Sequence, residues 1–346
     1  MSPRLSVLDL SPVAAGRGEA AALRETVELA RVAERLGYHR YWLAEHHGGE
    51  MVASSSPEIM ISAIAGATER IRVGSGGMML PNHSPLHVAE QFKVLEALYP
   101  ERIDLGIGRA PGTDHRTAMA LRGGSGAGGG DLPEMLGRLL AFAGLREWPE
   151  GHPFSPVRAA PDDASLPPIF LLGSSDFSAR VAASAGLGFA FAGQINPGEA
   201  VPMLRLYREQ FEPSPELGEP YAILGHNAIC AETSEEAERL AAPSRVAFRG
   251  LRKGMPVPLP TVDDAVPRDW PQRPPENGIE GLRMIVGTPT HLRETFDELL
   301  SRSGADELML MGSTHGLEER IRSYELIAAA FGLENTAAGQ DERATA

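Results

Sequence analysis

Hydrophobic positions follow two different periods along this chain. Short apolar runs of strand length alternate with longer stretches in which apolar residues recur every three or four positions, as in amphipathic helices. Residues 19–36 are typical of the second kind, because Leu23, Val27 and Ala30 share one helical face. Gly37 follows directly, where a helix is expected to end.

Eight strand–helix units are predicted from this pattern. The strands are expected at residues 5–10, 38–44, 71–79, 103–107, 169–172, 188–192, 222–231 and 307–311. Helices are expected at residues 19–36, 57–68, 84–98, 178–185 and 234–251, among others. Strands that alternate with helices need crossover connections and form a mostly parallel sheet. The prediction is an α/β fold, a single (β/α)8 TIM barrel with loop insertions at its C-terminal face. An open, doubly wound sheet is the structural alternative.

Two segments interrupt the alternation of strands and helices. Residues 123–130 are almost all glycine, and they form either a flexible spacer or a lid at the catalytic face. Residues 254–275 are rich in proline and are expected to be an excursion between the seventh and eighth units. We predict one barrel domain over residues 1–336, followed by a disordered tail over residues 337–346.

Composition narrows the class of protein. Of 346 residues, 42% are hydrophobic and 23% charged, as in a soluble globular protein with a sizeable core. A net charge of −14 argues against binding to nucleic acid or to an anionic membrane, although a basic pocket could hold one phosphate. Cys230 is the single cysteine, so an internal disulfide and a thiolate metal site are excluded. With no signal-like N-terminus and no membrane-spanning run, a cytoplasmic protein is expected.

The second predicted strand runs into Glu45, His46 and His47, and residues at such strand ends meet at the mouth of a barrel. His46 is the candidate catalytic residue, because a histidine that titrates near neutrality can donate or remove a proton. Glu45 either orients His46 or closes a buried salt bridge, and His47 is expected to be a packing residue. Neighbouring side chains at a strand end point to opposite sides, and no third ligand is apparent, so no metal site is expected.

The third and fourth strands end in glycine-rich segments. Gly76 and Gly77 allow the backbone to approach a planar or bulky group, although tight helix packing would also require them. Arg109 emerges where the backbone is open, which suits recognition of a phosphate. A surface ion pair is the alternative for this arginine.

The fifth strand leads into a serine-rich turn that opens a helix. Ser174, Ser175 and Ser178 present hydroxyl groups there, beside the free N–H groups of a helix N-terminus. This combination predicts an anion site. An ordinary serine N-cap is the alternative interpretation.

Several motifs in this order resemble one known family. Tyr-Trp-Leu-Ala-Glu-His-His at residues 41–47, Arg-Val-Gly-Ser-Gly-Gly-Met-Met-Leu-Pro at 72–81 and Arg-Ile-Asp-Leu-Gly-Ile-Gly-Arg-Ala-Pro-Gly-Thr at 102–113 are three of them. Together with His-Ser-Pro at 83–85 and Ala-Glu-Gln at 89–91, they look like the bacterial luciferase-like monooxygenase family. The resemblance extends from near residue 5 to past residue 330 and is most specific before residue 120.

The resemblance implies a barrel that binds FMN, usually as reduced flavin from a separate flavin reductase, and that uses O₂ to make a flavin hydroperoxide. His46 then corresponds to the catalytic histidine beside the flavin ring, and Gly76–Gly77 to a non-prolyl cis peptide under it. The residues that match phosphate-binding positions are Arg109, Ser174, Ser175 and Ser178. Luciferase itself has an acidic residue where this chain has Ser174, so that position departs from the pattern.

The resulting hypothesis is an FMN-dependent monooxygenase that acts on a small organic substrate with O₂, with incorporation of molecular oxygen. A flavin reductase and a second copy of the chain, in a homodimer, are the expected partners. Three alternatives stay open: a deazaflavin-dependent hydride-transfer oxidoreductase on the same barrel, a non-catalytic flavin-binding protein, and a metal-dependent hydrolase built on His46 and His47.

Overall fold

The structure is a computed structural model that describes residues 3–123, 131–269 and 282–333. The strands are β1 (Arg4–Asp9), β2 (Arg40–Leu43), β3 (Arg72–Ser75), β4 (Met78–Met79), β5 (Ile103–Gly108), β6 (Ile169–Gly173), β7 (Gly188–Ala192), β8 (Ala222–Cys230), β9 (Met284–Gly287) and β10 (Glu307–Met311). They pair in parallel in the order β10-β1-β2-β3-β5-β6-β7-β8-β9. A direct pairing of β10 with β8 closes an eight-stranded barrel, with β9 added beside β8.

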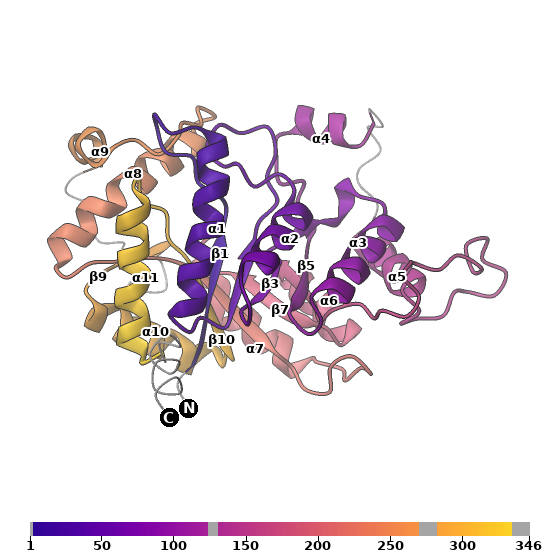
Figure 1. Ribbon diagram of the computed structural model, residues 1–346. Coiled ribbons are helices and arrows are strands. Elements are labelled where there is room, and N and C mark those ends of the chain that lie inside the picture. Colours follow the sequence, from indigo (N-terminus) through magenta and orange to yellow (C-terminus); the bar gives the residue numbers. More distant parts are fainter. Residues whose placement is uncertain (1–2, 124–130, 270–281, 334–346) are drawn as a thin grey trace, which may run out of the picture.

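Helices surround this barrel (Figure 1). The α-helices are α1 (Glu19–Arg35), α2 (Pro57–Ala67), α3 (Pro85–Leu98), α4 (His115–Leu121), α5 (Leu132–Phe142), α6 (Asp176–Ala185), α7 (Ala200–Glu209), α8 (Ser234–Arg252), α9 (Val262–Asp269), α10 (Pro289–Ser303) and α11 (Leu317–Phe331), with short 3₁₀ turns η1 (Leu80–Asn82) and η2 (Pro197–Glu199). The (β/α)8 prediction is confirmed. The open doubly wound sheet is wrong, because the β10–β8 pairing leaves no edge between these two strands.

The structure differs from the prediction at the third strand and after the eighth. The expected strand 71–79 is divided into β3 and β4, and a cis peptide bond joins Gly76 to Gly77 between them. β9 was not predicted. In the proline-rich excursion, Leu259 pairs with the loop after β1, accepting a hydrogen bond from the Ala15 N–H at 2.8 Å. Residues 124–130, 270–281 and the expected tail 337–346 lie outside the described residues, so the domain boundary at residue 336 stays a prediction.

A ring of buried charges occupies one level of the barrel interior. The Arg40 guanidinium on β2 bonds Asp104 on β5 and Glu307 on β10, each at 2.8 Å. The Trp42 indole N–H also donates to Asp104, at 3.0 Å. Since β2, β5 and β10 are not neighbours in the sheet, these contacts cross the inside of the barrel.

An apolar layer lies above those charges, toward the C-terminal ends of the strands. Its members come from six barrel strands and pack against one another: Leu8, Trp42, Ala44, Phe170, Ala190, Ile223 and Met309. All but Phe170 also line a cavity at that end of the barrel. The barrel therefore carries an apolar floor beneath an open mouth.

Candidate functional site

A cavity of about 1450 Å³ opens at the C-terminal ends of the strands. It brings together residues that follow β2, β3, β5 and β6, which lie far apart in the sequence. The predicted site residues that line it are His46, Gly76, Gly77, Arg109, Ser174, Ser175 and Ser178. Glu45 is fully buried and is not among the lining residues.

The segment after β2 is held by two neighbouring loops. The His46 N–H donates to the Ser54 carbonyl at 2.8 Å, and the His47 N–H donates to the Gly112 carbonyl at 3.1 Å. Gly112 has a φ of +65°, and a Cβ there would lie 2.5 Å from the carbonyl oxygen of Glu45. The loop after β5 therefore packs directly against the Glu45–His47 run.

The His46 side chain is half-buried on the cavity wall. Its Nδ1 atom is buried and has no hydrogen-bond partner among the described residues. Burial lowers the pKa of His46, an effect that the Glu45 charge opposes and the neighbouring His47 adds to. The imidazole is therefore neutral near pH 7 and able to accept a proton.

Glu45 has its hydrogen-bonding capacity filled by other residues. Its carboxylate accepts from His47 Nε2 at 2.7 Å, from His83 Nε2 at 2.9 Å and from the Met79 N–H at 2.7 Å. Burial by itself would raise the pKa of Glu45, but the bonds from His83, His47 and Met79 lower it overall. The arrangement matches the buried salt-bridge interpretation of Glu45, with His47 and His83 as its partners.

Sequence reasoning missed His83. It lies in the predicted His-Ser-Pro motif, which gave no sign that a carboxylate 38 positions earlier would be its partner. Burial would lower the pKa of His83, but the hydrogen bond to Glu45 raises it overall. Asn82, beside it, donates to Glu45 at 3.3 Å and to the Pro111 carbonyl at 2.9 Å. These two residues tie η1 to the ends of β2 and β5.

Gly76 and Gly77 form a part of the wall that leaves little room for a side chain. A Cβ on Gly76 would lie 2.6 Å from Leu8 Cδ1, and one on Gly77 would lie 2.8 Å from the carbonyl oxygen of Gly106. The peptide bond between the two glycines is cis, as the family resemblance implied. Their backbone is thus exposed directly to the cavity.

Arg109 lies beside the first turn of α6. Its guanidinium carbon is 4.5 Å from the ring centroid of Phe177, a contact that the sequence did not indicate. Within the described parts of the chain, Arg109 has no ion-pair partner. The charge is exposed and remains available at the cavity mouth.

The helix that starts after Ser175 leaves its first N–H groups without a side-chain cap. Ser175 occupies the N-cap position but makes no capping hydrogen bond, and Asn196 donates to the Ser174 carbonyl at 3.1 Å. Ser178 is buried, and a Cβ on Gly173 would lie 2.2 Å from its hydroxyl oxygen. Ser175 therefore stands at the N-cap position without capping α6 through its side chain, and the anion site stays a prediction that this geometry suits.

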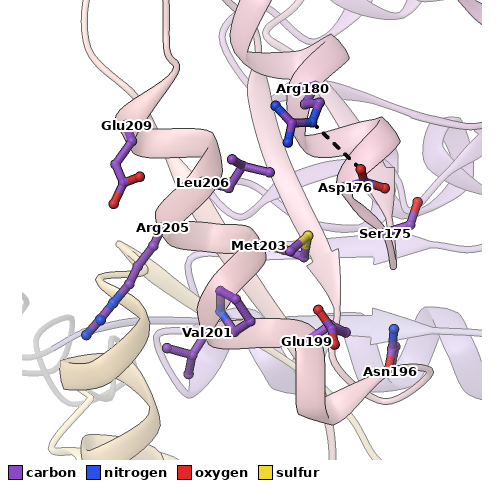
Figure 2. Close-up of a pocket in the computed structure, with 11 residues that line it drawn as sticks. Ser175, Asp176, Arg180, Asn196, Glu199, Val201, Met203, Arg205, Leu206 and Glu209 are labelled. Carbon is purple, nitrogen blue, oxygen red and sulfur yellow. Dashed lines mark ion pairs between the residues drawn. The ribbon is translucent and has the colours of Figure 1, made fainter.

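Ser175 also borders an outer groove of about 800 Å³ between α6 and α7. Figure 2 shows Ser175, Asp176 and Arg180 along one side of this groove, with Asp176 and Arg180 ion-paired at 3.7 Å. Asp176 is thus paired with Arg180 on the outer surface of α6. The inner side of the turn faces the barrel cavity.

The described residues hold neither a cluster of metal-ligating side chains nor a membrane-spanning helix. Over residues 3–123, 131–269 and 282–333, no group of three or more His, Cys, Asp or Glu side chains is arranged to hold a metal ion. No helix in the same ranges is both long and apolar enough to cross a membrane.

Comparison with known sequences gives matches along almost the whole chain. A family model described as luciferase-like monooxygenase matches residues 4–330. The chain is 48% identical to the protein YvbT of Bacillus subtilis, over 94% of this chain and 95% of the relative. A luciferase-like monooxygenase of Escherichia coli K12 is 40% identical (93% and 95% covered). An N-acetyl-S-alkylcysteine monooxygenase of B. subtilis is 34% identical (94% and 98% covered).

Solved structures show the same barrel. The crystal structure of apo-MsnO8 has a TM-score of 0.87 at 39% identity, covering 96% of this chain and 99% of that one. The oxygenating constituent of 3,6-diketocamphane monooxygenase from Pseudomonas putida, in complex with FMN, has a TM-score of 0.69 at 20% identity (96% and 98% covered). An F420-dependent secondary alcohol dehydrogenase has a TM-score of 0.62 at 14% identity (96% and 99% covered). At these low identities, the last two show the fold alone.

Proposed function

Because the chain belongs to the luciferase-like monooxygenase family, we propose that it is an FMN-dependent monooxygenase that uses reduced FMN and O₂ to oxygenate a small organic substrate. One observation carries this proposal. A bare glycine wall, a neutral histidine and an uncapped helix N-terminus with an unpaired arginine all face one cavity, among the described residues. These are the contacts that a flat ring with a phosphate tail requires.

The site fits FMN at both ends of that molecule. Gly76 and Gly77 would hold the flavin ring, since both line the cavity with backbone alone. Arg109 and the N–H groups at the start of α6 would hold the phosphate, with Ser174, Ser175 and Ser178 beside them. When bound, reduced FMN supplies the electrons with which O₂ is activated for transfer of one oxygen atom.

The protein's own residues protect and assist that chemistry. The apolar floor that includes Trp42, Ile223 and Met309 excludes water from the bottom of the cavity. His46 holds or accepts a proton beside the reacting groups, because its pKa is lowered and its Nδ1 has no partner in the described structure. Glu45 acts on the site through His47 and His83, and is a positioning residue.

The proposal is tested by isotope incorporation. N-acetyl-S-methylcysteine is a suitable first substrate, because a relative of 34% identity is named for that class. With reduced FMN and ¹⁸O₂, one labelled oxygen atom should enter the product. His46→Ala should lower the yield at least tenfold while FMN still binds. His87→Gln, an exposed histidine on α3 outside the cavity, is the matched control. Full labelled yield with His46→Ala would remove His46 from the mechanism.

Two other functions give different outcomes. The shared fold of an F420-dependent dehydrogenase keeps the deazaflavin alternative open. Anaerobic titration with reduced FMN and with reduced F420 separates the monooxygenase from the deazaflavin-dependent enzyme. A deazaflavin-dependent enzyme would bind reduced F420 and not FMN, and would transfer hydride from it. A flavin carrier without catalytic activity would bind FMN and incorporate no labelled oxygen with any substrate.

We also propose that the protein is a homodimer served by a separate flavin reductase. Ile59 on α2 is 65% exposed, and Val94 and Leu98 on the adjacent α3 are 45% and 62% exposed. Figure 1 shows α2 and α3 side by side on the outside of the barrel. A second copy would cover this apolar surface. Light scattering should give twice the chain mass, and Leu98→Asp should give the single mass.

A further inference from the structure

The wall of the cavity formed by α8 and β9 carries a concentration of positive charge. Four arginines line it in the described residues: Arg245, Arg249 and Arg252 on α8 and Arg283 just before β9. Glu238 is the one acidic residue of the described structure on this wall. The whole chain has a net charge of −14, so this wall differs in sign from the molecule around it.

The positive side chains share one face of α8. Arg245, Arg249 and Arg252 are four and three positions apart, a spacing that places successive residues on the same side of a helix. Arg245 is held by Glu238 at 2.5 Å. Arg252 and Arg283 are exposed at the rim, and within the described structure neither forms an ion pair. These two charges are therefore the ones most accessible to a ligand.

Apolar side chains adjoin these charges. The guanidinium carbon of Arg283 lies 5.9 Å from the ring centroid of Phe248, which also lines the cavity. Leu259, Leu282 and Met284 continue the apolar lining next to it. A ligand with a charged head and an apolar body would match this wall better than a wholly polar one.

This wall is separate from the proposed phosphate site. Arg109 and the serine turn follow β5 and β6, whereas α8 follows β8 on the other side of β7 in the sheet. Figure 1 shows α8 and α9 at the left of the molecule and α6 apart from them, to the right of the central strands. The basic wall would thus remain available when a phosphate occupied the start of α6.

We propose that Arg252 and Arg283 bind the carboxylate of an organic substrate whose apolar body lies along Phe248 toward the floor of the cavity. Guanidinium groups suit this role, because their paired N–H donors match the two oxygens of a carboxylate. That the ligand is a substrate rests on the proposed monooxygenase function, whereas the binding of the anion does not.

Binding of octanoate and of its uncharged isostere octanamide tests the proposal without turnover. Calorimetry on the flavin-free protein at low ionic strength should show octanoate binding about tenfold more tightly, the value of one charge-assisted pair. The double variant Arg252→Gln/Arg283→Gln should lose this preference. Lys253→Gln is the matched control, because it removes an exposed charge from the same helix end outside the cavity lining.

The outcomes separate this proposal from the flavin proposal. Arg109→Gln should weaken the binding of FMN and keep the preference for octanoate over octanamide. The double variant should lose this preference and bind FMN as tightly as the wild type. A protein that binds no FMN but keeps the preference would defeat the flavin proposal and leave this one standing. Equal binding of the two probes, or loss of the preference in Lys253→Gln or in Arg109→Gln, would overturn the basic-wall assignment.

Discussion

The substitution Glu45→Gln tests the buried hydrogen-bond centre beneath the site. The carboxylate accepts from four donors, and one of them, the Met79 N–H, belongs to the backbone and cannot become an acceptor. The Asn82 amide bonds the other carboxylate oxygen, and its second bond, to the Pro111 carbonyl, fixes its orientation. The NH₂ group of glutamine must therefore face one of these two donors and remove its hydrogen bond to residue 45. Loss of one such bond costs about 1–3 kcal/mol, and loss of the charge partner of His83 adds about 1 kcal/mol. We expect the free energy of unfolding to fall by about 2–4 kcal/mol.

The effect should depend on pH in a defined direction. The lowered pKa of Glu45 contributes stability above its ordinary value of 4.5, and this is lost as the pH falls through the folded value. The raised pKa of His83 contributes stability below its ordinary value of 6.5, and this is lost as the pH rises through the folded value. Wild type and variant should therefore differ most between pH 4.5 and 6.5.

Urea denaturation at several pH values measures this difference, and NMR titration of the histidine rings should show a lower pKa for His83 in the variant. Glu134→Gln is the control, because Glu134 is 57% exposed and its pair with Arg138 is worth at most about 0.5 kcal/mol. If Glu45→Gln and Glu134→Gln cost the same, or the pKa of His83 does not move, the carboxylate does not hold the site together.

Three further perturbations probe other parts of the barrel. Gly77→Ala places a Cβ 2.8 Å from a backbone oxygen of Gly106 and should lower the free energy of unfolding in urea by about 1–3 kcal/mol. Gly137→Ala, in open space on α5, is the control and should raise it by up to about 1 kcal/mol. Equal effects of the two substitutions would contradict the close approach of Gly77 to Gly106. Arg40→Met leaves two buried carboxylates without their shared partner and should cost about 3–5 kcal/mol in the same assay, so a loss under 1 kcal/mol would count against that network. Since burial lowers the pKa of His46 below 6.5, oxygenation should be lost as the pH falls through a value below 6.5, and an acid limb above pH 7 would rule out the neutral form as the active one.

The barrel could be predicted because each of its strands is marked by an apolar run in the sequence. The alternation of apolar strands with amphipathic helices placed all eight barrel strands, and α1 ends at Arg35, one residue before its predicted end. β9, which is four residues long and precedes α10, was missed, and it lies beside β8 outside the eight-stranded barrel. The break at Gly76–Gly77 depends on how closely β3 approaches β5, which the hydrophobic pattern does not record.

Only those site residues that lie at strand ends or in family motifs could be predicted from the sequence. His46, Arg109 and the serine turn share one cavity because parallel strands deliver their C-terminal residues to one mouth. The basic wall could not be foreseen, because three of its arginines lie on a helix and the fourth just before a short strand, and these segments meet only in the folded chain.

The side chains of Glu45, His46 and His47 alternate in direction at the end of β2. Neighbouring side chains at a strand end point to opposite sides, which argued that His46 and His47 do not bind one metal. The same alternation places Glu45 and His47, two positions apart, on one side, and their side chains are bonded at 2.7 Å. His46, between them, is left with an unpaired Nδ1 in the described structure and a place on the cavity wall. At the end of a strand, a carboxylate directly before a candidate catalytic histidine is therefore expected to bond the residue that follows the histidine, as Glu45 bonds His47. The catalytic histidine itself, here His46, is then expected to bond the ligand.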